Sequence, residues 1–444
     1  MASAAEQLAA NMNFSSFAKA KELQQRILFT VLILIVYRVG TYVPIPGVDP
    51  VQFARMFEQN SQGILSMFNV LGGGAVERMA IFALNVMPYI SASIIMQLMS
   101  ATIPSLEKLK KEGGEAGRKQ INQYSRYLTV VLATAQASAI AIGMNTPSAD
   151  GATLALNPGW FFMATTVVTL VGGTMLLLWM GEQITSRGVG NGVSLIIFAG
   201  IVAAIPGMLG NALSLSASGA MSGVAFFGGL ILIIAGLILI VFIERSQRRL
   251  LVQYPKRQQG NRMVGGDTSF LPLKINTAGV IPPIFASSLL LLPATAAGFQ
   301  SQAGPEWLQT AVAYLGAGSP VFLTLYAALI IFFCFFYTSV VFNPEETADN
   351  LRKYGGFLPG IRPGKRTTEY LDYVLSRLTL IGALYLTLIC LVPMMMSTNA
   401  GLGGTSILIV VSVSMDTISQ IQSHLLAHQY EGLIKKSKLR GRKR

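Results

Sequence analysis

The chain has 444 residues, of which 52% are hydrophobic and only 12% are charged, and its formal net charge is +13. A soluble chain of this length carries about a quarter charged residues, so the composition excludes an ordinary soluble globular protein. Because the basic residues lie in loops between apolar runs, the positive charge indicates membrane topology and not nucleic-acid binding.

Long apolar runs dominate the sequence. A helix needs about 20 mostly apolar residues to cross the hydrocarbon core of a bilayer. The sequence predicts ten such helices, at 26–43, 79–103, 124–143, 160–180, 189–210, 224–243, 274–298, 320–342, 374–396 and 403–425. The second and seventh runs contain prolines and polar residues, and spans of that kind tend to face protein or a water-filled cavity.

The loops between these runs differ in charge. Lysine and arginine gather before the first run, after the second, sixth and eighth, and in the tail, whereas the loops 144–159, 211–223, 299–319 and 397–402 contain neither. Because positive loops stay in the cytoplasm, we expect both termini on the cytoplasmic side.

The predicted domain organisation follows from this count. We expect a cytoplasmic N-terminal segment (1–25), a first five-helix half (26–210), a second half (211–425) and a basic cytoplasmic tail (426–444). Large cytoplasmic loops are expected at 244–273 and 343–373. Five is odd, so the second half is inverted relative to the first, as in many transport proteins. The two halves show no strong residue-level similarity.

The segment 61–78 is apolar but too short to span, and Gly72, Gly73 and Gly74 interrupt it. A short apolar segment can be re-entrant. Composition alone leaves a re-entrant helix and an ordinary outer loop helix equally open.

Groups for chemistry are scarce. Cys334 and Cys390 lie inside apolar runs and resemble small buried hydrophobes. His424 and His428 share a helical face without further metal ligands nearby. Arg38 is expected to snorkel outward from the first helix, and Asp416 receives no role. We therefore predict no enzyme activity, no cofactor and no metal. A secondary transporter, the main alternative, and an intramembrane enzyme both need more ionisable groups at depth.

Four stretches resemble the SecY family in the family's order, and the resemblance extends over nearly the whole chain. The segment 181–192, GEQITSRGVGNG, closely resembles a family signature, and it lacks the lysine and preceding strand of a phosphate-binding loop. Residues 83–97 resemble the family's second helix, and residues 278–288 its seventh. Residues 342–351 with 359–364 resemble the loop after the eighth.

The resemblance implies an all-α fold with ten transmembrane helices. In the family, two inverted halves form an hourglass channel for unfolded polypeptide, and a short re-entrant helix plugs it. Residues 64–78 occupy the plug position, with the plug residues Ile64, Leu65, Met67, Phe68, Val70, Leu71 and Gly72. An aliphatic constriction is implied at Val86, Ile90, Ile197, Ile284 and Ile409. Family members often have isoleucine at the position of Val86. An apolar constriction of this kind gates by dewetting.

The resemblance also implies a lateral gate between the second and seventh helices, with Ser91, Gln136, Asn276 and Leu292 at the seam. Such residues can equally tie ordinary helices together, since polar contacts between membrane helices contribute only about 0.6–2 kcal/mol.

Docking of the SecA motor ATPase and the ribosome is implied at Arg257, Arg262 and Arg362. For any single loop arginine, a role in topology alone remains open. Many relatives have a second arginine where this chain has Asn261. The further partners implied are the small membrane subunits SecE and SecG, preprotein signal sequences and lipids of the bacterial inner membrane.

Overall fold

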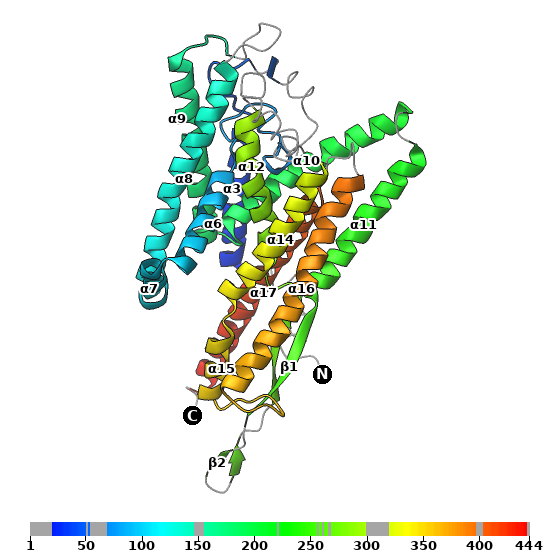
Figure 1. Ribbon diagram of the computed structural model, residues 1–444. Coiled ribbons are helices and arrows are strands. Elements are labelled where there is room, and N and C mark those ends of the chain that lie inside the picture. Colours follow the sequence, from blue (N-terminus) through cyan, green and yellow to red (C-terminus); the bar gives the residue numbers. More distant parts are fainter. Residues whose placement is uncertain are drawn as a thin grey trace.

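The computed structural model describes residues 20–49, 52–53, 69–145, 155–219, 222–254, 257–259, 262–264, 268–298, 319–396 and 403–441. Within them the chain is almost entirely helical (Figure 1). The long helices are α3 (Lys21–Gly40), α6 (Met87–Thr102), α8 (Gly114–Asn145), α9 (Trp160–Arg187), α10 (Gly192–Ala217), α11 (Gly223–Arg245), α12 (Ile281–Gly298), α14 (Pro320–Val341), α16 (Lys365–Met396) and α17 (Gly404–Gly441). Two short helices, α7 (Pro104–Glu112) and α15 (Pro344–Lys353), lie at one end of the bundle.

Each of the ten predicted apolar runs coincides with one long helix, but the number of spans is smaller by length and composition. Among the described residues, eight helices are long and apolar enough to cross a membrane. A ninth span is reached if α6 and α7, which meet at a bend of 101°, are counted together. In α12 the short apolar helix runs from Ile281 to Leu290. The exact count of ten is therefore not confirmed.

The two soft runs begin later than predicted. The second predicted helix was placed at 79–103, but α6 begins at Met87, after a series of turns in which Met79 and Asn85 have φ of 43° and 50°. The seventh was placed at 274–298, but α12 begins at Ile281. In both helices proline stands in the first turn, where its missing N–H needs no partner, so proline marks the helix start.

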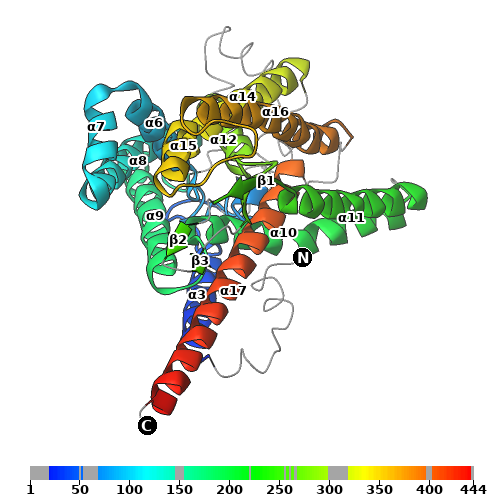
Figure 2. The ribbon, with the colours of Figure 1, turned by 90° about the horizontal axis from the view of Figure 1, so that it is seen from below.

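The helices pack as two groups joined along two seams. In the first group α8 packs on α6 and α9, and α10 packs on α3 and α9. In the second group α14 packs on α12 and α16, and α17 packs on α11 and α16. The groups meet where α12 contacts α6 and α8, and again where α17 contacts α3 and α10. Figure 2 shows the helices from below, with α6, α8 and α9 on one side and α11 on the other. Each group contains five of the long helices named above. The predicted domain bounds and the inversion of one half relative to the other stay predictions.

Apolar side chains are distributed as a membrane requires. One large buried cluster runs through both groups of helices. The outward surfaces are also apolar, and on α11 only 6% of the membrane-length window is buried, with Val224 84% exposed and Phe242 70% exposed. In water such a surface would drive aggregation, so these faces belong in lipid or against a partner helix.

The loop after α11 folds into strands, which the sequence did not predict. Strand β1 (Gln247–Gln253) pairs antiparallel with β4 (Thr268–Lys274), and β2 (Arg257–Gln259) pairs with β3 (Arg262–Val264) at the tip. Backbone hydrogen bonds of 2.9 Å run both ways between Gln253 and Phe357 of the loop before α16. A second apolar cluster, including Leu250, Val252 and Leu358, joins the two loops into one unit.

Candidate functional site

The five residues predicted to form the constriction come from four helices of both groups. Val86 directly precedes α6, which carries Ile90, while Ile197, Ile284 and Ile409 lie on α10, α12 and α17. Four of them are buried in the main apolar cluster, and half-buried Ile284 packs against the same cluster. All five side chains thus belong to one apolar interior. Their action as a constriction ring remains a prediction.

Part of the predicted plug lies outside the described residues, namely Ile64, Leu65, Met67 and Phe68. The described remainder is helical from Asn69 to Leu71 and continues in turns towards α6. Val70 and Leu71 are buried, and both Gly73 and Gly74 have positive φ, at 65° and 84°. The end of this segment packs against α10, because a Cβ on Gly200 would lie 2.6 Å from the carbonyl oxygen of Leu71.

At the predicted lateral gate, Ser91 is buried and Gln136 is half-buried, and α12 packs against both of their helices. Leu292 lies on α12, but its side chain is outside the described part. Across the α6–α12 seam the Ser288 hydroxyl lies 3.6 Å from the Met87 sulfur and also donates to the Ile284 carbonyl at 2.8 Å. A thioether is a weak acceptor, so this contact holds the seam weakly.

Asn276 points to a different partner from the one its predicted gate role suggests. Its amide donates to a carboxylate oxygen of Glu244 at 2.6 Å and to the Gly279 carbonyl at 3.1 Å. Glu244 lies on α11, so these two bonds tie the start of α12 within the second half. Asn276 therefore fixes the segment that leads into the gate helix.

The family-like signature at 181–192 forms a junction between helices at the second seam. The Gly190 N–H donates to the Gln420 side chain of α17 at 2.9 Å, and the Val189 N–H donates to the Thr30 hydroxyl of α3 at 3.1 Å. At Gly192 a Cβ would lie 2.6 Å from the carbonyl carbon of Gly181. Glycine is required there because α9 and α10 approach too closely for any side chain.

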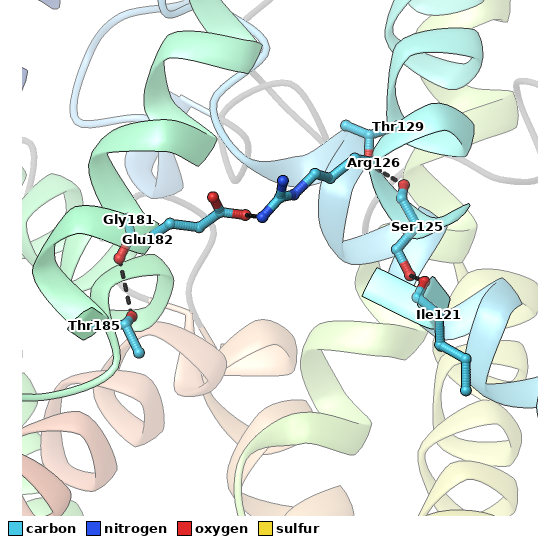
Figure 3. A network of polar contacts seen from close by, with 7 residues as sticks. All are labelled: Ile121, Ser125, Arg126, Thr129, Gly181, Glu182 and Thr185. Carbon is cyan, nitrogen blue, oxygen red and sulfur yellow. Dashed lines mark hydrogen bonds and ion pairs between the residues drawn. The ribbon is translucent and has the colours of Figure 1, made fainter. Parts of the chain in front are cut away.

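Within the first half an ion pair joins α8 to α9. Arg126 and Glu182 approach to 2.7 Å, and Figure 3 shows the two side chains reaching towards each other between the helices. Nearby hydroxyls bond back to their own helices, as Ser125 does to Ile121 at 3.0 Å. The paired side chains are 45% and 39% exposed, so water screens their attraction and the pair contributes little to the stability of the fold.

The predicted docking arginines lie on the unit formed by the two loops. Arg257 stands opposite Val264, and Arg262 stands opposite Gln259, in the β2–β3 hairpin. Arg362 is exposed, and its carbonyl accepts a hydrogen bond from the Thr367 hydroxyl at 3.0 Å. Because the Gln253–Phe357 bridge joins the two loops, the three arginines belong to one end of the molecule.

Arg38, which was expected to snorkel outward, is half-buried and has partners within the protein. Its guanidinium donates to the Gly73 carbonyl at 2.6 Å and to the Tyr42 hydroxyl at 3.0 Å. The sequence pattern could not reveal these partners. The prediction for Cys334 and Cys390 is confirmed, since both are free and buried.

Among the described residues, a helical bundle with eight or nine apolar spans, two packed groups of helices and a continuous apolar interior defines a polytopic helical membrane protein. A family model described as SecY matches residues 80–418. The chain belongs to the SecY family.

Similar proteins agree over almost the full length. "Protein translocase subunit SecY" of Rickettsia bellii is 52% identical over 437 residues, covering 97% of this chain and 100% of that protein. The protein of the same description from Escherichia coli strain K12 is 51% identical over 426 residues, covering 95% and 96%.

Solved structures share the fold at low sequence identity. The chain described as "The structure of a protein conducting channel" has a TM-score of 0.64 at 17% identity, covering 90% of this chain and 92% of that one. "Sec61 in the Canine ribosome-channel complex from the endoplasmic reticulum" has a TM-score of 0.60 at 17% identity, with the same coverage.

Proposed function

We propose that this chain is the protein-conducting channel of a Sec translocase, which passes unfolded preproteins across the membrane and releases apolar segments sideways into lipid. The observation that carries the proposal is that Val86, Ile90, Ile197, Ile284 and Ile409 share one apolar interior. Branched aliphatic side chains close around an extended chain without specific hydrogen bonds, which suits substrates of any sequence. Their apolar surface also limits ion leakage by dewetting.

The channel is passive. The chain is a translocase subunit and not an enzyme by itself, as its family membership indicates. Energy for transport therefore comes from partners. The motor ATPase SecA and the ribosome are the partners we propose.

The docking surface for these partners is the unit made of β1–β4, α15 and the loop before α16. Arg257, Arg262 and Arg362 belong to it. Its own apolar cluster and the Gln253–Phe357 hydrogen bonds give it a fixed shape. A fixed, positively charged surface suits acidic protein or ribosomal RNA backbone.

We place the end of the molecule that carries this unit in the cytoplasm of a bacterium, with both termini on the same side, because the basic loops gather there. The lipid-facing helices include α11, which exposes most of its apolar surface. We propose that SecE and SecG cover part of the outward surfaces of the two halves.

The lateral gate is the seam at which α12 meets α6 and α8. The seam is weakly held by the Ser288–Met87 contact, and Ser91, Gln136 and Leu292 lie on its helices. A signal segment of about 20 apolar residues is stable in lipid and not in water, so it leaves the channel through this seam.

A reconstituted system tests the proposal. The full chain, with the subunits that co-purify in gentle detergent, is placed in vesicles with SecA, ATP and a signal-bearing preprotein. We expect preprotein to become protected from added protease, and protection to require both the signal and SecA. Equal protection without a signal, or none with every component present, would show that the chain is not this channel.

A further inference from the structure

The described end of the plug segment is held by side chains from two other parts of the first half. Asn85 donates to the Leu71 carbonyl at 2.8 Å, Tyr37 donates to the Gly72 carbonyl at 3.4 Å, and Arg38 donates to the Gly73 carbonyl at 2.6 Å. Three consecutive backbone carbonyls are thus each bound by a different side chain. Sequence patterns and family resemblance assigned none of these three side chains to the plug.

The same segment sits directly on the surface of α10. A Cβ on Gly200 would lie 2.6 Å from the Leu71 oxygen, and a Cβ on Gly73 would lie 2.9 Å from the Cα of Gly200. Both closest atoms belong to the backbone, so no side-chain rotation relieves the contact. The carbonyls reach their donors only because positions 73 and 200 lack side chains.

Both the backbone and the side chain of Asn85 are in unfavourable environments. It is 1% exposed, its φ is 50°, and its Oδ1 is buried without a hydrogen-bond partner among the described residues. Left-handed backbone and an unpaired buried acceptor both cost free energy. Its one bond from Nδ2 goes to the plug segment, and Val86 of the predicted constriction is the next residue. Asn85 therefore links the described end of the plug segment to the chain directly before Val86.

We propose that Tyr37, Arg38 and Asn85 form a plug latch, defined as the three side chains that bind the carbonyls of residues 71–73 and hold the plug closed. This inference rests on the proposed channel function and goes beyond it by naming positioning residues for the closed state. The bonds attach to backbone carbonyls, so the latch does not depend on the identity of the plug side chains. Plug opening breaks these bonds and slides residues 71–73 away from Gly200.

Two independent changes weaken the latch. Arg38→Met removes the guanidinium donor and keeps an unbranched side chain. Gly200→Ala wedges residues 71–73 outward and crowds the Tyr37 hydroxyl, which would lie 3.0 Å from the new Cβ, while Arg38 and Asn85 stay unchanged. The matched control for the wedge is Gly207→Ala, on the same helix, because a Cβ there meets nothing within 4 Å. Arg38→Lys is the conservative rescue, since an ammonium group can still donate to the Gly73 carbonyl.

The first readout is resting ion conductance of the full complex in planar bilayers. Losing a charged donor to a carbonyl shifts the open fraction of the plug by about tenfold to a hundredfold. We expect Arg38→Met and Gly200→Ala to raise conductance by at least about tenfold, Arg38→Lys to restore most of the closure, and Gly207→Ala to match the wild type.

The second readout reports plug position directly. In a chain with both native cysteines replaced by serine, Val70→Cys is buried when the plug is closed and should react slowly with a membrane-impermeant maleimide. We expect the reaction to accelerate about tenfold with either latch change. Unchanged reaction and conductance in both changes, or an equal rise in Gly207→Ala, overturns the latch.

Deletion of residues 65–72 separates the latch from the proposed function. We expect Arg38→Met to add no conductance in this background, because the plug it acts on is gone. If Arg38→Met adds as much there as in the full chain, the latch is wrong although the channel stands. Failure of preprotein transport by the wild-type complex, in contrast, overturns the proposed function itself.

Discussion

The glycine at the α9–α10 junction gives the sharpest structural prediction. In Gly192→Ala the new Cβ would lie 2.6 Å from the carbonyl carbon of Gly181 and 2.8 Å from its Cα. The carbonyl oxygen of Gly181 lies closer still, and ordinary contact begins at 3.4 Å, so the two helices must separate by more than about 0.8 Å at this point. Overpacking of this kind costs about 1–3 kcal/mol. The separation also disturbs the Gly190–Gln420 and Val189–Thr30 hydrogen bonds, which join α10's entrance to α17 and α3.

The measurement is the temperature at which half of the detergent-solubilised protein is lost from the monodisperse peak in size-exclusion chromatography. We expect Gly192→Ala to lower it by at least about 2 °C. Gly207→Ala is the control and should equal or exceed the wild type, since alanine favours a helix over glycine by about 1 kcal/mol. If Gly192→Ala matches Gly207→Ala, the close approach of α9 and α10 is not a constraint and the reasoning fails.

Three further outcomes are expected. Arg362→Glu should reduce SecA-driven transport at least tenfold with unchanged thermal stability, because it reverses a charge on the docking unit; normal transport would leave Arg362 a topology charge. Replacing Ile90 and Ile284 together by glycine should raise resting conductance in planar bilayers, and an unchanged closed-state current would contradict the constriction. Arg126→Gln should change stability by less than about 1 kcal/mol, since the pair with Glu182 is half-exposed; a larger loss, restored by exchanging the two charges, would contradict that estimate.

The membrane class and the helix order could be predicted from the sequence, because an apolar run of about 20 residues is stable as a helix in a bilayer and not exposed to water. The helix starts at Met87 and Ile281 could not, since proline and polar residues inside a soft run do not say on which side of them the helix lies. The apolar pattern also could not fix the number of spans at ten. In α12 the short apolar helix ends at Leu290, so it is too short to count as a span by length.

The hairpin β1–β4 was missed because its strands carry charged residues and Pro272, which weaken any alternation. Hydrogen bonds to backbone groups were also out of reach. Arg38 was assigned to the interface, yet it binds the Gly73 carbonyl. Gly190 and Gln420 lie 230 residues apart, and only the folded chain brings them together. The positions of the aliphatic constriction residues came from family resemblance, since each alone is indistinguishable from ordinary helix packing.

A cross-link across the α6–α12 seam tests the central claim, that polypeptide passes through a channel whose halves part there. In a chain with both native cysteines replaced by serine, cysteines go in at Met87 and Ser288, whose side chains touch across the seam. The control pair replaces Arg126 and Glu182, which touch within one half. Each pair is closed by a short bifunctional methanethiosulfonate reagent, whose disulfide links are cleaved by reduction. A direct disulfide is not used because Arg126 and Glu182 meet only through the ends of long side chains.

Preprotein transport into vesicles is then measured before closing, after closing and after reduction of the disulfide links. We predict that closing the pair at 87 and 288 stops transport, that reduction restores it, and that closing the pair at 126 and 182 leaves transport unchanged. Complete closure of the 87–288 pair with undiminished transport would show that the seam does not have to open.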